Sequence, residues 1–154
     1  MKIYLGSDHG GFELKQQIKE FLTEKASYDL EDVGCDSGES CDYPVFGRAV
    51  GEAVVGNPGS LGILICGSGV GINIAANKVP GVRCALVNNL ELARLSREHN
   101  GANIIALGER TPFIDDPIGI VDTFLTTEVD ESERHQRRRS QIEPCCGGGC
   151  CGED

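Results

Sequence analysis

The sequence predicts an α/β sandwich in which helices cover both faces of a parallel sheet. Two observations lead to this fold class. Short apolar runs rich in β-branched residues alternate with stretches of helical spacing along the 154 residues. The run Leu61–Cys66 is apolar apart from one glycine, as expected for a strand buried on both faces. We therefore expect one three-layer, Rossmann-like α/β domain, for which the chain is long enough.

The N-terminal half is expected to hold three strands and two helices. The strands are predicted at residues 3–6, 28–33 and 61–66, and the helices at 11–25 and 44–55. In the first helix, apolar side chains recur close to helical spacing, at Phe12, Leu14, Ile18, Phe21 and Leu22. Pro44 fits the first turn of the second helix, where its missing N–H costs little.

The C-terminal half is expected to continue this alternation. The strands are predicted at residues 82–87 and 103–107, and the helices at 72–78, 90–98 and 132–142. One more helix is expected to run to Leu125 from either Ile114 or Pro117. Asn88 or Asn89 is expected to cap the helix at 90–98.

Residues 143–154 are expected to form a separate Cys- and Gly-rich tail. It reads Cys145-Cys146-Gly-Gly-Gly-Cys150-Cys151 after the last predicted helix, a composition typical of a flexible segment. Its thiols could instead bind a soft metal ion, but the paired C-x-x-C spacing of a structural zinc site is missing.

Composition and charge argue against several classes of function. The chain carries 14 basic and 24 acidic side chains and a net charge of −10, which disfavours nucleic-acid binding. No apolar stretch approaches the roughly 20 residues that span a membrane. Residues 1–6 are too short for a signal peptide and fit a first strand. We expect a cytoplasmic protein without a membrane or nucleic-acid partner, whose eight cysteines are reduced by default.

Four loops that follow predicted strand ends are expected at one edge of the sheet. They contain Asp8-His9, Cys66–Gly71, Asn88-Asn89 and Gly108–Arg110. Ligands of open α/β sheets bind outside the carboxyl ends of the strands. This edge is therefore the expected site.

The segment Ile63-Leu-Ile-Cys66-Gly-Ser-Gly-Val-Gly71 joins an apolar strand to a glycine-rich turn. Backbone N–H groups at the start of a helix favour anions and the thiolate form of a cysteine. Cys66 is therefore a candidate base, and Ser68 can relay a proton or donate a hydrogen bond. The spacing differs from the dinucleotide fingerprint and from a P-loop. The alternative is a turn that needs glycine for its geometry alone, with Cys66 as an inert core residue.

Two pairs of polar residues at predicted loop positions suit acid–base chemistry. Asp8-His9 follows the first strand and His99-Asn100 follows a helix, and histidine titrates near neutral pH. Each pair also has a structural alternative: Asp8 can cap the helix that begins at Gly11, and His99-Asn100 can be an ordinary helix end. No group of side chains has metal-ligand spacing, so no metal is expected.

One basic run stands out in this acidic chain. Arg134 and Arg138 are four residues apart, on one face of a predicted helix. Such a pair can hold a phosphate through forked donors. The alternative is a solvated face that neighbouring acidic side chains balance.

Six blocks of sequence together resemble one enzyme family. They are Asp8-His9-Gly10-Gly11-Phe12, Asp42-Tyr43-Pro44, Ile65-Cys66-Gly67-Ser68-Gly69-Val70-Gly71, Ala75-Ala76-Asn77-Lys78, Ser96-Arg97-Glu98-His99-Asn100 and Arg134-His135-Gln136-Arg137-Arg138. In this order they resemble ribose-5-phosphate isomerase of type B, a family that includes galactose-6-phosphate and allose-6-phosphate isomerases. The resemblance covers residues 1–142 and identifies them as a sugar-phosphate isomerase domain.

The resemblance implies a five-stranded parallel sheet, a homodimer or tetramer with shared active sites, and cofactor-free interconversion of ribose 5-phosphate and ribulose 5-phosphate through an enediolate. Cys66 would be the base, with Ser68 beside it. His99 would donate a proton in opening the furanose ring, together with Asp8 and Tyr43. The other positions would hold the enediolate oxygens (Gly67, Gly69, Val70, Gly71 and Asn100) or the substrate, chiefly its phosphate (His9, Arg110, Arg134 and Arg138).

Two alternative functions stay open. The first is the same chemistry on a hexose 6-phosphate, which His99 disfavours because this acid opens a furanose ring in the family. The second is a sugar-phosphate binding module without catalysis, which the presence of Cys66, Ser68 and His99 disfavours.

Overall fold

Five parallel strands form one sheet, in the spatial order β2-β1-β3-β5-β4. The computed structural model describes residues 1–142, so the predicted tail at residues 143–154 lies outside the described residues. The strands are β1 (Lys2–Ser7), β2 (Asp29–Asp32), β3 (Leu61–Cys66), β4 (Cys84–Leu86) and β5 (Ile104–Gly108). The predicted fold class is confirmed, and so is the five-stranded sheet that the family resemblance implied.

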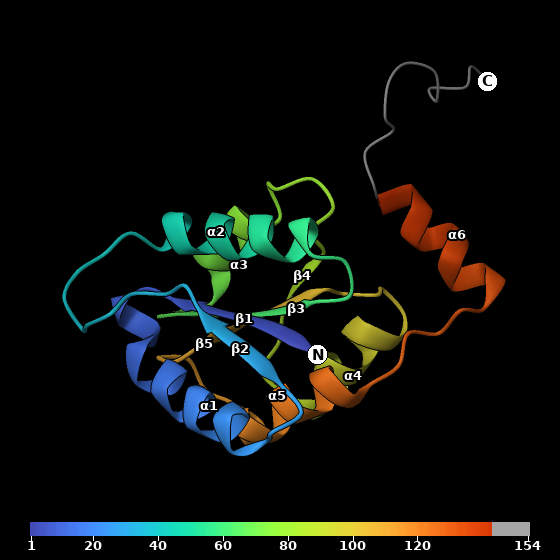
Figure 1. The fold of residues 1–154 in the computed structure, drawn as a ribbon. Coiled ribbons are helices and arrows are strands. Elements are labelled where there is room, and N and C mark those ends of the chain that lie inside the picture. Colours follow the sequence, from blue (N-terminus) through green and yellow to red (C-terminus); the bar gives the residue numbers. More distant parts are fainter. Residues whose placement is uncertain (143–154) are drawn as a thin grey trace.

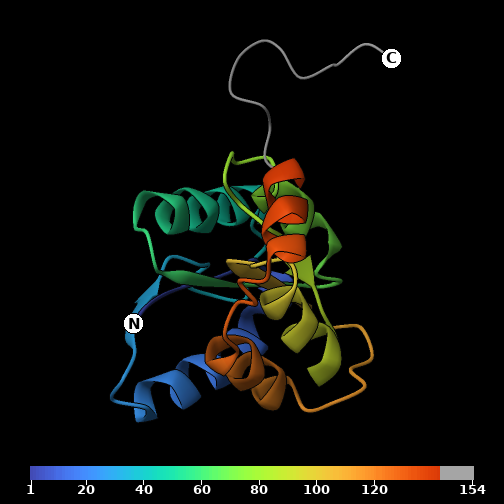
Figure 2. The same cartoon turned by 90° about the vertical axis from the view of Figure 1, so that its right-hand side faces the viewer.

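Helices cover both faces of the sheet (Figure 1). α2 (Tyr43–Gly56) and α3 (Val70–Ala76) form one layer, and α1 (Phe12–Glu24), α4 (Leu90–Glu98) and α5 (Pro117–Thr126) form the other. The 3₁₀ turn η1 (His9–Gly11) links β1 to α1. The view turned by 90° shows the same layers, with α6 (Glu133–Ile142) standing in front of them (Figure 2).

The central strands are buried on both faces, which explains their nearly continuous apolar sequences. In β3, Ile63 and Ile65 belong to the hydrophobic core on the side of α1 and α5. Leu64 and Cys66 belong to the core on the side of α2 and α3. This alternation follows from the two-residue period of a strand. The thiol at the end of β3 therefore faces the α2–α3 layer.

α3 starts earlier than predicted. We expected a glycine-rich loop through Gly71 and a helix from Ile72, but the helix begins at Val70. Gly69 is its N-cap and has a backbone φ of +76°, a conformation that residues with a side chain rarely adopt. Val70 and Gly71 therefore belong to the first turn of the helix rather than to the loop.

Side-chain caps decide the two helix starts that the sequence left open. Asn89, the second candidate asparagine, accepts the Leu92 N–H at 2.8 Å and caps α4. Asp116 accepts the Gly119 N–H at 2.8 Å, so α5 begins at Pro117 rather than at Ile114. Such caps satisfy N–H groups that have no partner within the helix.

Candidate active site

A cleft of about 480 Å³ opens at the carboxyl edge of the sheet. It lies beside the neighbouring strands β1 and β3, where the strand order changes direction, which is the usual ligand position in open α/β sheets. Loops after β1, β3 and β5 line the cleft together with the starts of α2 and α3. The lining residues are Asp8, His9, Gly10, Tyr43, Cys66, Gly67, Ser68, Val70, Gly71, Ile74 and Arg110.

Cys66 ends β3 at this cleft, with 4% of its surface exposed. Its Sγ accepts the backbone N–H of Gly69 at 3.1 Å. A Cβ atom on Gly69 would lie 2.5 Å from the side chain of Leu86 and 2.9 Å from backbone of Leu107. Glycine is thus required here both for its left-handed backbone and for space. The turn consequently brings a backbone donor to the thiol.

The side chain of Ser68 lies on the exposed side of the same turn. Its Oγ accepts the Val70 N–H at 3.3 Å, and the residue lines the cleft. A hydroxyl in this place is free to rotate and to donate to a bound molecule. The turn thus presents a thiol, a hydroxyl and backbone N–H groups to one space.

Asp8 and His9 enter the cleft from the end of β1. Asp8 is 6% exposed and accepts the Gly10 N–H at 2.9 Å. It therefore caps the 3₁₀ turn η1 and not α1, which starts at Phe12 without a side-chain cap. The Asp8 side chain also lines the cleft. The Nδ1 atom of His9 lies 3.3 Å from both the backbone N and the backbone O of Cys41. The backbone of the β2–α2 loop therefore restrains the imidazole ring.

Tyr43, at the start of α2, and Arg110, in the loop after β5, complete the lining of the cleft. A Cβ atom on Gly71 would lie 2.6 Å from the ring of Tyr43, so this glycine allows the ring to pack against the first turn of α3. The Arg110 N–H donates to the Gly67 carbonyl at 2.9 Å. These contacts place a phenol and a guanidinium beside the turn that follows Cys66.

A second group of predicted site residues lies elsewhere in the chain. His99 caps the end of α4, and its ring stacks on His135 of α6 with centroids 4.4 Å apart and an interplanar angle of 10°. The neighbouring Asn100 lines a different hollow of about 230 Å³, at the β4 edge. Arg134 and Arg138 are exposed on α6. None of these four residues lines the cleft at Cys66.

Burial and neighbouring charges affect the protonation of His135. Burial, followed by the charges of His99 and Arg134, lowers the pKa of His135. The Arg134 Nε–H donates to the Nε2 atom of His135 at 3.2 Å, which requires that nitrogen to be unprotonated. His135 is therefore neutral at pH 7, and its uncharged ring packs against the ring of His99.

The predicted residues thus form two clusters. Nine of them line one cleft: Asp8, His9, Tyr43, Cys66, Gly67, Ser68, Val70, Gly71 and Arg110. Gly69 belongs to the same turn and contacts the thiol. The other four, His99, Asn100, Arg134 and Arg138, lie toward α6, at the far end of the sandwich in Figure 1. One chain on its own therefore holds the predicted residues in two separate clusters.

Some residues near these clusters were not among the predicted ones. Ile74 lines the cleft, and its spacing from Val70 and Gly71 on one helix face could have revealed it. His135 lies in one of the sequence blocks without a predicted role, and its ring stacks on His99. Glu109 accepts the Leu14 N–H at 2.9 Å, a contact across 95 residues that no local pattern indicates.

Residues 1–142 contain neither a metal-binding cluster nor a membrane-spanning helix. No group of three or more His, Cys, Asp or Glu side chains in this range is arranged to hold a metal ion. No helix in this range is both long and apolar enough to cross a bilayer.

Comparisons with known proteins point to one enzyme family. A family described as ribose/galactose isomerase matches residues 3–142. Ribose-5-phosphate isomerase B of Mycolicibacterium paratuberculosis is 50% identical over 139 residues, which cover 90% of this chain and 87% of that protein. The Escherichia coli protein of the same name is 43% identical over 141 residues, covering 92% of this chain and 93% of the relative.

Solved structures show the same fold. The structure of Clostridium thermocellum ribose-5-phosphate isomerase B superimposes with a TM-score of 0.86 at 52% identity, covering 92% of this chain and 95% of the other. The Thermotoga maritima ribose 5-phosphate isomerase structure gives a TM-score of 0.86 at 44% identity, covering 92% and 97%.

Proposed function

Because this chain belongs to the ribose/galactose isomerase family, we propose that it interconverts ribose 5-phosphate and ribulose 5-phosphate. The chain is an isomerase, as its relatives are. The observation that carries the choice of chemistry is the Cys66 thiol at the cleft, with the Gly69 N–H 3.1 Å from its sulfur. Aldose–ketose isomerisation needs one base, donors for a developing oxyanion and a grip on the phosphate.

In the proposed reaction Cys66 removes the proton from C2 and returns it to C1. The backbone donor at Gly69 favours the thiolate that this step requires. The negative charge that develops on the sugar oxygens is stabilised by the N–H groups from Gly67 to Gly71 and by Asn100. Ser68 is placed to exchange a proton with one of these oxygens. The reaction passes through an enediolate and needs no cofactor.

The remaining groups act on the ring and on the phosphate. His99 donates the proton that opens the furanose, with Asp8 and Tyr43 beside it. His9, Arg110, Arg134 and Arg138 bind the substrate, and their positive groups hold mainly its phosphate. Because the phosphate is bound at one end of the sugar, C1 and C2 at the other end are held next to the Cys66 thiol.

We further propose that two copies of the chain share each site. His99 and the α6 arginines lie away from the cleft of their own chain, so a second copy has to supply them. The apolar side chains of Val70, Ile74 and Leu86 are 45%, 53% and 42% exposed, around α3 and the edge strand β4. Apolar groups gathered beside an active cleft suit a subunit interface.

The test of the proposed reaction is an isomerase assay on ribose 5-phosphate with Cys66→Ala. We expect kcat to fall by about 10²–10⁴, the usual contribution of a general base. Cys84→Ala is the matched control, because this cysteine lies in β4 and does not line the cleft. An undiminished rate in Cys66→Ala, or no activity of the natural chain on this sugar, would contradict the proposal.

The two alternatives give different results in the same set of assays. A hexose 6-phosphate isomerase would show the higher kcat/KM on allose or galactose 6-phosphate. A binding module would be stabilised by sugar phosphate against heat without turning it over.

A further inference from the structure

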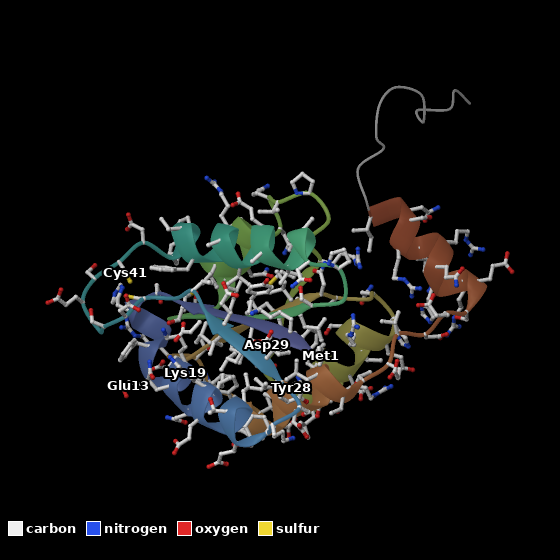
Figure 3. All side chains as sticks on the ribbon, viewed as in Figure 1. Met1, Glu13, Lys19, Tyr28, Asp29 and Cys41 are labelled. Carbon is white, nitrogen blue, oxygen red and sulfur yellow. The ribbon has the colours of Figure 1, made fainter. Side chains whose placement is uncertain are left out.

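Two thiols meet next to the cleft but outside the proposed chemistry. The Sγ atoms of Cys35 and Cys41 lie 2.6 Å apart, and both cysteines are free in this structure. They belong to the loop between β2 and α2. Cys41 lies at the end of the sandwich where α1 and α2 begin (Figure 3). Neither residue lines the cleft.

The backbone of Cys35 is fixed from the core. Its N–H donates to the Ser7 carbonyl at 2.9 Å, which extends the pairing along β1. Its carbonyl accepts from the Nζ atom of Lys15 at 2.7 Å, and Lys15, which is only 1% exposed, also pairs with Asp32. This half of the thiol pair therefore has a defined position.

The backbone of Cys41 is fixed from the cleft. Its N–H donates to the Nδ1 atom of His9 at 3.3 Å. The residues between the two cysteines, 36–40, are all exposed. Anchors at both ends of this short loop thus hold the two sulfur atoms together. Cys35 is buried and Cys41 is partly exposed, so Cys41 is the thiol that a small solute reaches first.

The surroundings also set the resting state of the pair. Burial and the contact with Cys35 raise the pKa of the Cys41 thiol to about 11. The Cys41 sulfur is therefore a protonated thiol at neutral pH. A disulfide needs the sulfurs about 2.05 Å apart, so they have only a short way to move.

We propose that Cys35 and Cys41 form a reversible disulfide that locks the β2–α2 loop against the cleft. With a small disulfide such as oxidised glutathione as the oxidant, one cysteine sulfur attacks it and releases one molecule of thiol. The second cysteine sulfur then displaces the other thiol. Overall, two cysteine thiols and one disulfide give one protein disulfide and two small thiols, so electrons and protons balance. Excess reduced glutathione reverses the exchange.

The lock acts on the site through His9. The Cys41 main chain contacts the imidazole of this residue, and Tyr43 follows two residues later at the start of α2. Closing the loop between the cysteines reduces the freedom of both groups. This consequence rests on the proposed function, in which His9 binds substrate, whereas the disulfide itself does not.

Peptide mapping tests the disulfide directly. The full chain is equilibrated in glutathione buffers of increasing oxidised fraction, alkylated and digested with trypsin. Residues 26–48 form one tryptic peptide that contains Cys35, Cys41 and no other cysteine, whereas Cys66 falls in residues 49–78 and the tail in residues 140–154. We expect the first peptide to lose two hydrogens and both alkylation sites, reversibly. Alkylation of both cysteines, or a glutathione adduct on one, would overturn the proposal.

The second readout is the melting temperature at constant protein concentration. Because the folded state already holds the sulfurs in contact, closing this short loop should raise Tm by about 5 °C. Cys35→Ser and Cys41→Ser are the controls and should show no rise under the same oxidant, although Cys66 and the tail thiols remain. An unchanged or lower Tm in fully oxidised natural chain would contradict a lock.

The third readout is the KM for ribose 5-phosphate. The change on oxidation is measured for the natural chain and for the same two control variants, and the two changes are compared. A restrained His9 should lower KM by about two- to threefold at unchanged kcat, since less freedom is lost on binding. An increase in KM would mean that the bond distorts the site rather than locking it. If the chain has no activity on this sugar, the proposed function fails, while the mass and Tm results still decide the disulfide.

Discussion

Cys66 and Cys84 both border the core on the α2–α3 side, yet their thiols have different surroundings. Cys66 accepts a backbone N–H and lines a cleft. For Cys84, burial alone raises the pKa of the thiol. Reactivity of a cysteine depends on donors and access rather than on residue type. The sequence favours Cys66 over the other cysteines because Cys66 precedes a glycine-rich turn.

The role of single arginines on α6 can be separated by kinetics. Replacing Arg134 by Ala should raise the KM for ribose 5-phosphate about 10- to 100-fold, the loss of one charge-assisted hydrogen bond, and change kcat by less than about threefold. Arg137→Ala is the control, since Arg137 is also exposed on the same helix and its replacement removes the same charge. Steady-state kinetics decides the matter, and an unchanged KM in Arg134→Ala would contradict a phosphate role.

Asp32 carries a pH-dependent part of the stability. Burial tends to raise the pKa of its carboxyl, but hydrogen bonds from Lys15, Lys19 and a backbone N–H lower it below the ordinary 3.8. An acid with a lowered pKa in the folded state adds stability above its unfolded pKa, and this stability is lost as pH falls through the folded value. The pair with the buried Lys15 should therefore weaken only below about pH 4.

Asp32→Asn tests this expectation. At pH 7 the variant should lose about 3 kcal/mol of unfolding free energy, because Lys15 stays buried without its charged partner. The difference from the natural chain should shrink as pH falls below about 4. Lys19→Gln removes the half-exposed partner of the same carboxylate and should cost less than about 1 kcal/mol. Urea titrations at several pH values measure both, and a pH-independent difference would refute the charge interpretation.

At the scale of elements, the strand–turn–helix from β3 to α3 shows both what the sequence predicts and what it misses. The bounds of β3 follow from its apolar run, because a strand buried on both faces is apolar along its whole length. The start of α3 does not, because it depends on the backbone angle of Gly69, and G-x-G-x-G does not say which glycine is left-handed. Side-chain caps at Asn89 and Asp116 are recognisable by residue type but not by exact position.

Gly69→Ala tests what this turn requires. Two penalties are expected, the strain of a positive φ and the clash of the new Cβ with Leu86 and Leu107. Gly59→Ala is a matched control, since Gly59 has a φ of +89° but nothing within 4 Å of the added Cβ. The control should cost about 1 kcal/mol of unfolding free energy, and Gly69→Ala at least about 2 kcal/mol more. Equal losses in urea titrations would show that backbone strain alone matters.

At the scale of the whole molecule, topology explains why the predicted residues fall into two clusters. A helix that follows a parallel strand starts at the carboxyl edge of the sheet and runs back toward the amino edge. α4 does so over nine residues, about 13 Å, so His99 at its end is carried away from the cleft. The sequence blocks provide the candidate residues, but they do not say that one chain separates them. Only the arrangement of strands and helices shows that separation.

Complementation between two inactive variants tests whether subunits share sites. Cys66→Ala and His99→Asn are each expected to be inactive alone. In a hybrid dimer one site then carries both changes and the other carries neither, so about half of the natural activity should return. Co-expression with two different affinity tags isolates this hybrid, and a doubly tagged natural dimer is the control. A purified hybrid as inactive as its parents would mean that each site is built within one chain, and that α4 and α6 must move to reach Cys66.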